Sequence, residues 1–236
     1  MRDRGSLASV TSPRNLVDID ANVRTYLSGR SSTARYTSFD YCFNYFRTFR
    51  DADDVAGLVR DEQLQMSCLQ LGFYLASWGM FRGKAELLQH SAKRLCPVIE
   101  VVVQVPTAIW DVDVDGYGPD VQALIFDVAR DLAEVLPGGR SSTLVTKTML
   151  GVFGCVPAFD RYFREGFGAS TFGPKALSAI GTYYRMNAET IEACRVPTID
   201  FATGEPTIRQ YTAAKVVDMV FFIEGARGGP KQSETT

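Results

Sequence analysis

The apolar residues of this chain recur mainly at three- and four-residue intervals, which is the spacing of one face of an α-helix. The clearest run lies within residues 53–80, where the apolar positions are Leu64, Cys68, Leu71, Leu75 and Trp78. Similar spacing, bounded by capping or helix-breaking residues, predicts further helices over residues 38–49, 84–104, 120–136, 142–152, 160–165, 175–193 and about 207–224. Pro97 should kink or divide the helix over residues 84–104.

This pattern favours a mainly α fold, a single-domain helical bundle with a helix-hairpin-helix-like element. Residues 197–206 alternate and turn, which is typical of a short β-hairpin or an extended loop. We expect a poorly ordered Arg/Ser-rich arm over residues 1–34, with at most one or two helical turns near residues 16–27. The helical domain should cover residues 35–225, with Gly225 capping the last helix and a disordered tail over residues 226–236.

The amino-acid composition excludes some classes of function but does not identify the function of the protein. The chain has 236 residues, 46% of them hydrophobic, and a formal net charge of −2, which argues against coating nucleic acid through bulk charge. The five cysteines show no CxxC or Cys/His spacing, so we expect reduced thiols, no zinc and no cofactor. Without a secretion signal or a run of about 18 apolar residues, the protein is expected to be cytoplasmic, with no membrane partner.

Two motifs with potential chemistry are incomplete. Asp111, Asp113 and Asp115 precede a glycine, as in the first half of a calcium loop, but Pro119 and Gln122 occupy the later ligand positions. An acidic loop ahead of the next helix is the expected alternative to a metal site. The single histidine, His90, lies on a predicted helix without any nearby nucleophile motif, so we expect it at the surface or at the edge of the core.

The most informative stretch is residues 142–163, which carries one lysine and one aspartate in an otherwise apolar, glycine-punctuated segment. Gly151, Gly154 and Pro157 should break the backbone between two helices, so that Lys147 and Asp160 could face one cleft. Desolvation favours the neutral, nucleophilic form of a lysine, and an aspartate can take a proton or stabilise positive charge on a sugar. The alternative is a structural ion pair, or two side chains that reach solvent separately.

The same segment resembles a known family. Thr146-Lys147, followed by Val156-Pro157-Ala158-Phe159-Asp160, is similar to the helix-hairpin-helix DNA glycosylases of the 8-oxoguanine type, particularly their divergent bacterial relatives. That family has Gly-x-Gly directly before its Thr-Lys, whereas the glycines here are at positions 138 and 139. Residues 71–79 and 147–163 also look like a group of bacterial proteins of unassigned role.

The resemblance implies that Lys147 attacks C1′ of a damaged nucleotide to form a Schiff base, and that Asp160 stabilises charge and assists proton transfer. It implies DNA as a partner, with Trp78 or the aromatic helix over residues 38–49 holding a flipped base. The other expected DNA-binding residues are Arg82, Lys84, Arg161 and Arg164, which would have to lie on the same face as Lys147.

A second hypothesis requires no catalysis. The protein could be a non-enzymatic α-helical binding module, such as a defence or mobile-element accessory protein, with an aromatic-lined pocket. The expected lining is Phe39, Tyr45, Trp78 and Phe153. The mild acidity of the chain favours this hypothesis, because proteins that bind duplex DNA usually carry a stronger basic face.

Overall fold

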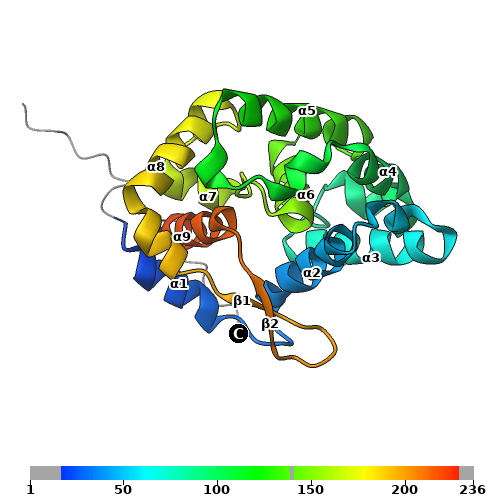
Figure 1. The fold of residues 1–236 in the computed structure, drawn as a ribbon, viewed down its shortest axis with the longest axis horizontal. Coiled ribbons are helices and arrows are strands. Elements are labelled where there is room, and N and C mark those ends of the chain that lie inside the picture. Colours follow the sequence, from blue (N-terminus) through cyan, green and yellow to red (C-terminus); the bar gives the residue numbers. More distant parts are fainter. Residues whose placement is uncertain (1–16, 139–140, 229–236) are drawn as a thin grey trace, which may run out of the picture.

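The computed structural model describes residues 17–138 and 141–228, and within them the chain is mainly α-helical (Figure 1). The α-helices in this part of the chain are α1 (Ile19–Ser28), α2 (Ser38–Asp51), α3 (Asp61–Ser77), α4 (Cys96–Gln104), α5 (Pro119–Val135), α6 (Ser142–Phe153), α7 (Arg161–Phe167), α8 (Pro174–Ala193) and α9 (Ala213–Gly228). Short 3-10 helices connect several of them. Among the described residues, no helix is both long enough and apolar enough to cross a membrane.

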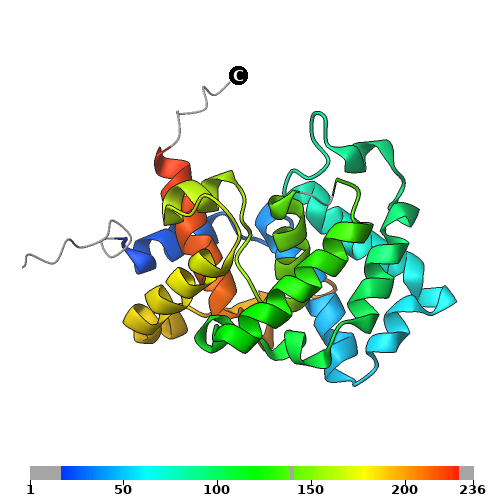
Figure 2. The same ribbon diagram turned by 90° about the horizontal axis from the view of Figure 1, so that it is seen from above.

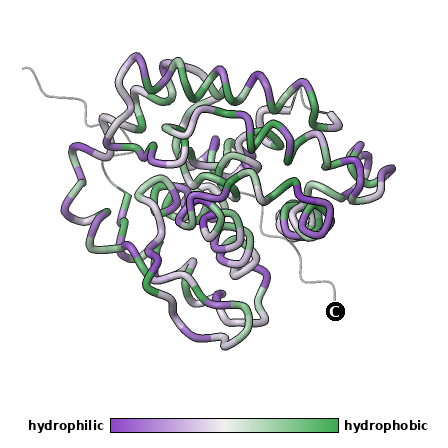
Figure 3. Tube along the Cα trace, turned by 45° about the vertical axis from the view of Figure 1, so that its right-hand side comes forward, coloured by the Kyte–Doolittle hydropathy of each residue, from purple (hydrophilic) through white to green (hydrophobic). Residues whose placement is uncertain are grey.

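The helices form two groups within one fold (Figure 2). In one group, α9 is packed against α1, α7 and α8; in the other, α2 to α6 pack on one another. Helix α9 is buried on every side along most of its length, which confirms the prediction that the last helix is a core element. Helices at the upper edge of Figure 3 alternate between hydrophobic and hydrophilic segments, as expected where one face meets the core and the other meets water.

Part of the expected Arg/Ser-rich arm is helical, close to the one or two helical turns expected near residues 16–27. Helix α1 lies inside the expected Arg/Ser-rich arm and buries Ile19, Val23 and Tyr26. Asn22 Nδ2 on α1 donates a hydrogen bond to Val220 O on α9. Three apolar residues spaced by four and three are therefore enough to dock the helix, although the segment is otherwise polar. Residues 1–16 and 229–236, the remainder of the expected arm and tail, lie outside the described residues.

The predicted helix over residues 84–104 is only partly correct. Residues 86–89 and 92–95 form separate 3-10 turns, and the α-helix α4 starts at Cys96. Pro97 occupies the first turn of α4, where its missing N–H costs nothing, so the segment is divided there, which is one of the two predicted outcomes, and is not kinked.

Gly225 does not cap α9, because the helix continues to Gly228. A Cβ atom at Gly225 would overlap the backbone oxygen of Tyr162 on α7. A Cβ atom at Gly166 on α7 would in the same way overlap Phe221 O on α9. The two glycines allow the backbones of α7 and α9 to come into direct contact.

The expected hairpin is present as an antiparallel pair, β1 (Pro197–Ile199) and β2 (Pro206–Gln210), at the bottom of Figure 1. It is held against α2, since Asn44 Nδ2 donates to Ile199 O and Asp40 Oδ1 accepts from Ile199 N. This contact puts the hairpin loop beside α2.

Candidate active site

Helix α6 carries Lys147 into the interior. Ser141 caps its first turn, accepting a hydrogen bond from Leu144 N, and Gly154 ends it in the left-handed conformation with φ of 71°. Gly151 does not break the helix as expected; it lies within α6, where the ring of Tyr74 packs directly on its Cα. Every residue from Leu144 to Phe153 is buried, including Lys147, which is only 3% exposed.

The connection from α6 to α7 is held by hydrogen bonds on both sides. Thr146 Oγ1 accepts from Phe159 N at 2.8 Å, and Thr143 Oγ1 donates to Phe159 O at 2.8 Å. From the opposite side, Asp218 Oδ1 on α9 accepts from Ala158 N at 3.0 Å. These contacts fix the backbone immediately before Asp160.

The two oxygens of the Asp160 carboxylate have different partners. Oδ1 accepts from Phe163 N at 3.0 Å and so caps α7, as the sequence predicts for a helix opening at Asp160. Oδ2 accepts from Lys147 Nζ, also at 3.0 Å. Lys147 Nζ donates a second hydrogen bond to Trp78 O at 3.1 Å and lies 5.4 Å from the Trp78 ring centroid.

Lys147 and Asp160 line a pocket of about 320 Å³ at the junction of the two helix groups; we call it the Lys147 pocket. Its other lining side chains come from the 3-10 turn before α2, the end of α3, α7 and α9. They include Arg35, Tyr36, Trp78, Arg82, Tyr162 and Phe222. The pocket thus combines one carboxylate, two guanidinium groups and several aromatic rings around the buried amine of Lys147.

A second buried pair lies behind this pocket, and the sequence analysis did not identify it. Lys215 Nζ donates to Asp218 Oδ2 at 2.9 Å and to the hydroxyl of Tyr26 at 3.0 Å. Burial raises the pKa of Tyr26 well above its ordinary value, which keeps the phenol neutral beside the lysine. Lys215 Nζ is also 5.4 Å from the Trp78 ring centroid, so Trp78 contacts both lysines. A lysine and an aspartate three residues apart in the apolar run over residues 213–223 are the signal in the sequence.

The four other expected DNA-binding residues are only partly brought together. Arg82 lines the Lys147 pocket. Arg164 Nε donates to Asp160 O at 3.3 Å, and Arg161 lies directly after Asp160 in the first turn of α7. Arg161 and Arg164 line a neighbouring, open depression of about 480 Å³, where Arg161 pairs with Glu165. Lys84 is exposed two residues beyond Arg82 and does not line the Lys147 pocket.

The three aspartates of the candidate calcium loop have different surroundings. Asp113 accepts from the backbone N–H groups of Ala213 and Ala214, each at 2.7 Å, and thereby caps α9. Asp111 pairs with Arg50, and Asp115 is exposed. No cluster of three or more potential metal-ligating side chains occurs within residues 17–138 and 141–228. His90 is exposed at the end of a 3-10 turn.

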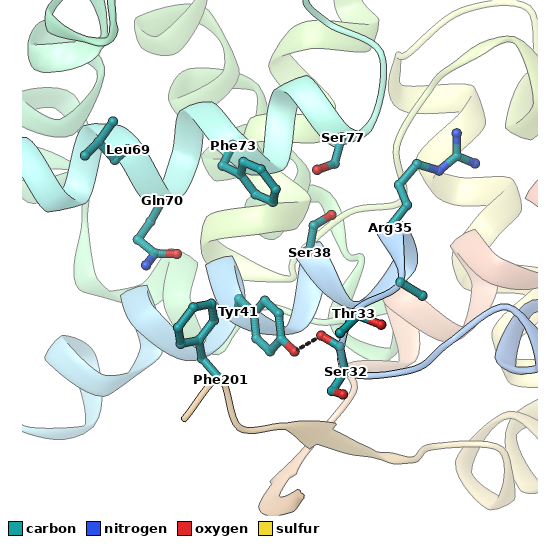
Figure 4. Close-up of a pocket in the computed structure, with 11 residues that line it drawn as sticks. Ser32, Thr33, Arg35, Ser38, Tyr41, Leu69, Gln70, Phe73, Ser77 and Phe201 are labelled. Atoms are coloured by element: carbon teal, nitrogen blue, oxygen red, sulfur yellow. Dashed lines mark hydrogen bonds between the residues drawn. The ribbon is translucent and has the colours of Figure 1, made fainter. Parts of the chain in front are cut away.

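The aromatic pocket expected for a binding module is not where the sequence analysis puts it. Phe39 and Phe153 are fully buried in the core, and Tyr45 binds the hydroxyl of Ser67. A larger groove, of about 670 Å³, lies instead between α2, α3 and the hairpin loop (Figure 4). We call it the Phe73 groove, after its most prominent ring.

Comparison of the chain with protein-family models, with curated proteins and with solved structures found no match in any of the three.

Proposed function

We propose that this protein is a DNA-glycosylase-like enzyme that removes a nucleobase through a Schiff-base lysine, Lys147, assisted by Asp160. The observation that carries the proposal is the 3.0 Å contact between a nearly buried amine and a carboxylate on the wall of an accessible, cation-bordered pocket. A lysine and a carboxylate within hydrogen-bond reach are what a nucleophile and its proton acceptor require.

The reaction would begin with proton transfer from Lys147 Nζ to Asp160 Oδ2, which leaves an electron pair on nitrogen. Nζ then attacks C1′ of the sugar, the glycosidic bond breaks, and its electrons leave with the base, which takes up a proton. A proton next moves from Nζ to O4′ as the C1′–O4′ bond opens, giving an iminium ion between Lys147 and C1′. Water hydrolyses this intermediate and restores the free lysine.

The surrounding residues suit the other requirements of such a reaction. Arg35 and Arg82 supply positive charge for the phosphates that flank the reacting nucleotide. The guanidinium of Arg35 lies 5.4 Å from the Trp78 ring centroid, and Tyr36 stacks on Trp78 with centroids 5.4 Å apart. A base flipped out of its stack needs flat rings of this kind to hold it.

Borohydride trapping tests the proposal, because hydride addition at C1′ converts the iminium ion into a stable secondary amine. The wild type would be incubated with DNA containing 8-oxoguanine, other damaged bases or an abasic site. We expect a covalent adduct whose mass corresponds to protein plus DNA, and peptide mapping should locate it at Lys147.

Two variants and one control sharpen this experiment. Lys147→Ala should give no adduct, whereas Lys175→Ala, which removes an exposed lysine at the start of α8, should react like the wild type. Asp160→Asn keeps an oxygen for the α7 cap and should slow adduct formation by about 100-fold or more, a typical loss for a removed acid–base group. An adduct that persists in folded Lys147→Ala would exclude the proposed nucleophile.

The second candidate function is a non-enzymatic binding module. The observation in its favour is the Phe73 groove, whose exposed aromatic side chains lie outside the Lys147 pocket. If the folded wild type yields no adduct and releases no base from any of these substrates, the enzymatic proposal fails and the binding function becomes the leading one.

A further inference from the structure

The Phe73 groove has an unusual share of exposed aromatic surface. Phe73 on α3 is 69% exposed and Phe201 in the hairpin loop is 75% exposed. Figure 4 shows the Phe73 side chain projecting from α3 on the upper side of the groove, with Tyr41 of α2 and Phe201 on its lower side. The rings of Tyr41 and Phe201 meet edge to face, with centroids 5.0 Å apart. Exposed apolar side chains that gather at one groove, unlike those scattered singly, often mark a binding surface.

The groove also contains a polar group without a partner. Ser38 is only 4% exposed, and its hydroxyl oxygen has no hydrogen-bond partner within the described residues. In Figure 4, the hydroxyls of Ser38 and Ser77 lie between α2 and α3, at the end of the groove nearest to Arg35. A buried hydroxyl that is left unpaired is costly, so this position favours a ligand that can donate or accept a hydrogen bond there.

The groove adjoins the Lys147 pocket through Arg35, which lines both. Within the described part of the chain, Arg35 is the one charged residue among those that line the groove. The Phe73 groove therefore offers flat rings, an unpaired hydroxyl and one cation, Arg35, which also lines the pocket of the proposed reactive lysine.

We propose that the Phe73 groove binds an unpaired nucleobase from the strand whose reacting nucleotide occupies the Lys147 pocket. This inference rests on the proposed function and narrows its substrate to single-stranded or locally unpaired DNA. Only a base released from its pairing partner presents both faces to aromatic rings and its edge to a hydroxyl such as that of Ser38. The phosphate between the two nucleotides lies against Arg35.

Fluorescence anisotropy with labelled oligonucleotides tests the groove separately from the chemistry. The probe is a short single strand with a tetrahydrofuran abasic analogue, which cannot form a Schiff base, and the comparison is the same strand fully paired except opposite the analogue. Phe73→Ala and Phe201→Ala should each weaken single-strand binding by about tenfold, in the range measured for loss of one stacked base. Phe73→Trp should retain binding.

Ile208→Ala is the matched control, since Ile208 is a fully exposed apolar residue on β2 that does not border the groove. It should bind like the wild type. Because Phe73, Phe201 and Ile208 are exposed, all these variants should fold normally.

Unchanged affinity in both phenylalanine variants, equal affinity for the single strand and the duplex, or no binding by the wild type would each overturn the inference. Failure of the chemistry is distinguishable from these outcomes. If Lys147 gives no borohydride adduct but binding still depends on Phe73, the groove binds an unpaired base although the glycosylase proposal falls.

Discussion

At the residue scale, the two buried lysines differ in what surrounds them. The partner of Lys147, Asp160, has a side chain that is 14% exposed and lines a pocket, whereas the side chain of Asp218, the partner of Lys215, is 9% exposed and does not line that pocket. A charge that lines a pocket is more easily solvated by water when its partner is removed than a charge that is buried away from any pocket.

This difference predicts unequal effects on stability. Lys215→Met should lower the free energy of unfolding by about 3–5 kcal/mol, because it leaves the buried Asp218 carboxylate without its cation. Lys147→Met should cost about 1–3 kcal/mol, since Asp160 keeps its hydrogen bond to Phe163 N and reaches the pocket. Urea denaturation of both variants would measure the two losses, and equal losses would contradict the distinction.

The sequence identifies one of these pairs and not the other for a physical reason. Lys147 and Asp160 lie thirteen residues apart in a single segment, so local helix and turn signals are enough to bring them together. The surroundings of Lys215 depend on Tyr26, which is 189 residues away. Periodicity in one segment carries no information about such a distant contact.

At the element scale, the close approach of α7 and α9 depends on two glycines. Gly225→Ala would force the helices apart and should destabilise the protein by about 3 kcal/mol or more, the cost of an overpacked interface. Gly228→Ala, at the end of the same helix with no atom near the added Cβ, should change stability by less than about 1 kcal/mol. Thermal unfolding of the two variants gives the comparison, and similar melting temperatures would show that the helices can separate at little cost.

The hairpin loop should respond to acid. Asp200 Oδ1 accepts hydrogen bonds from the backbone N–H groups of Ala202 and Thr203 and from the Thr203 hydroxyl. The N–H and hydroxyl of Thr203 hold the pKa of Asp200 below its ordinary value. A carboxyl whose folded pKa is lowered stabilises the fold above its unfolded pKa, and this contribution is lost as the pH falls through the folded value.

Carboxyl NMR should therefore show Asp200 titrating below about 3.9, the usual value for aspartate. The same residue in an unfolded peptide covering residues 196–211 should titrate normally, which serves as the control. Equal titration in the two samples would mean that these hydrogen bonds do not persist in solution.

Some element boundaries follow the sequence and others do not. Ser141, Gly154 and Asp160 lie at helix ends in the structure, whereas Gly151 and Gly225, both expected at boundaries, lie within helices. Residues 84–95 have leucines at helical spacing but form 3-10 turns, because spacing alone does not distinguish one α-helix from successive short turns. Helix α1 lies where the sequence predicts only one or two helical turns, and its few apolar residues suffice because the partner surface, α9, is itself strongly apolar.

At the scale of the whole molecule, the net charge of −2 hides an uneven distribution around the candidate site. Arg35 and Arg82 border the Lys147 pocket, and Arg161 and Arg164 lie next to Asp160. A protein that neutralises about four phosphates of a single strand should show a slope of about −3 in log K against log salt concentration. Anisotropy titrations at salt concentrations between about 50 and 200 mM would measure this slope. A slope twice as steep would indicate a longer cationic track.

The Phe73 groove could not be predicted from the sequence, because the pattern of apolar residues does not show which aromatic side chains stay exposed. The groove's aromatic rings come from three separate segments of the chain, namely Tyr41, Phe73 and Phe201. The residues next to each ring in the sequence give no indication that the ring is exposed. Phe39, which is expected from the sequence to line a pocket and lies on the same helix as Tyr41, is instead fully buried. Which aromatic residues remain outside the core depends on how α2, α3 and the hairpin pack together.

The position of Trp78 gives the molecule a built-in optical signal. The chain has two tryptophans, and Trp110 is buried against Phe153, with ring centroids 4.8 Å apart. Trp78 has Lys147, Lys215 and Arg35 each 5.4 Å from its ring, and its Nε1 has no partner among the described residues. Indole emission responds to nearby charge and to hydrogen bonding. In a Trp110→Phe variant, occupation of the Lys147 pocket should therefore shift the fluorescence of a single reporter, without any added label.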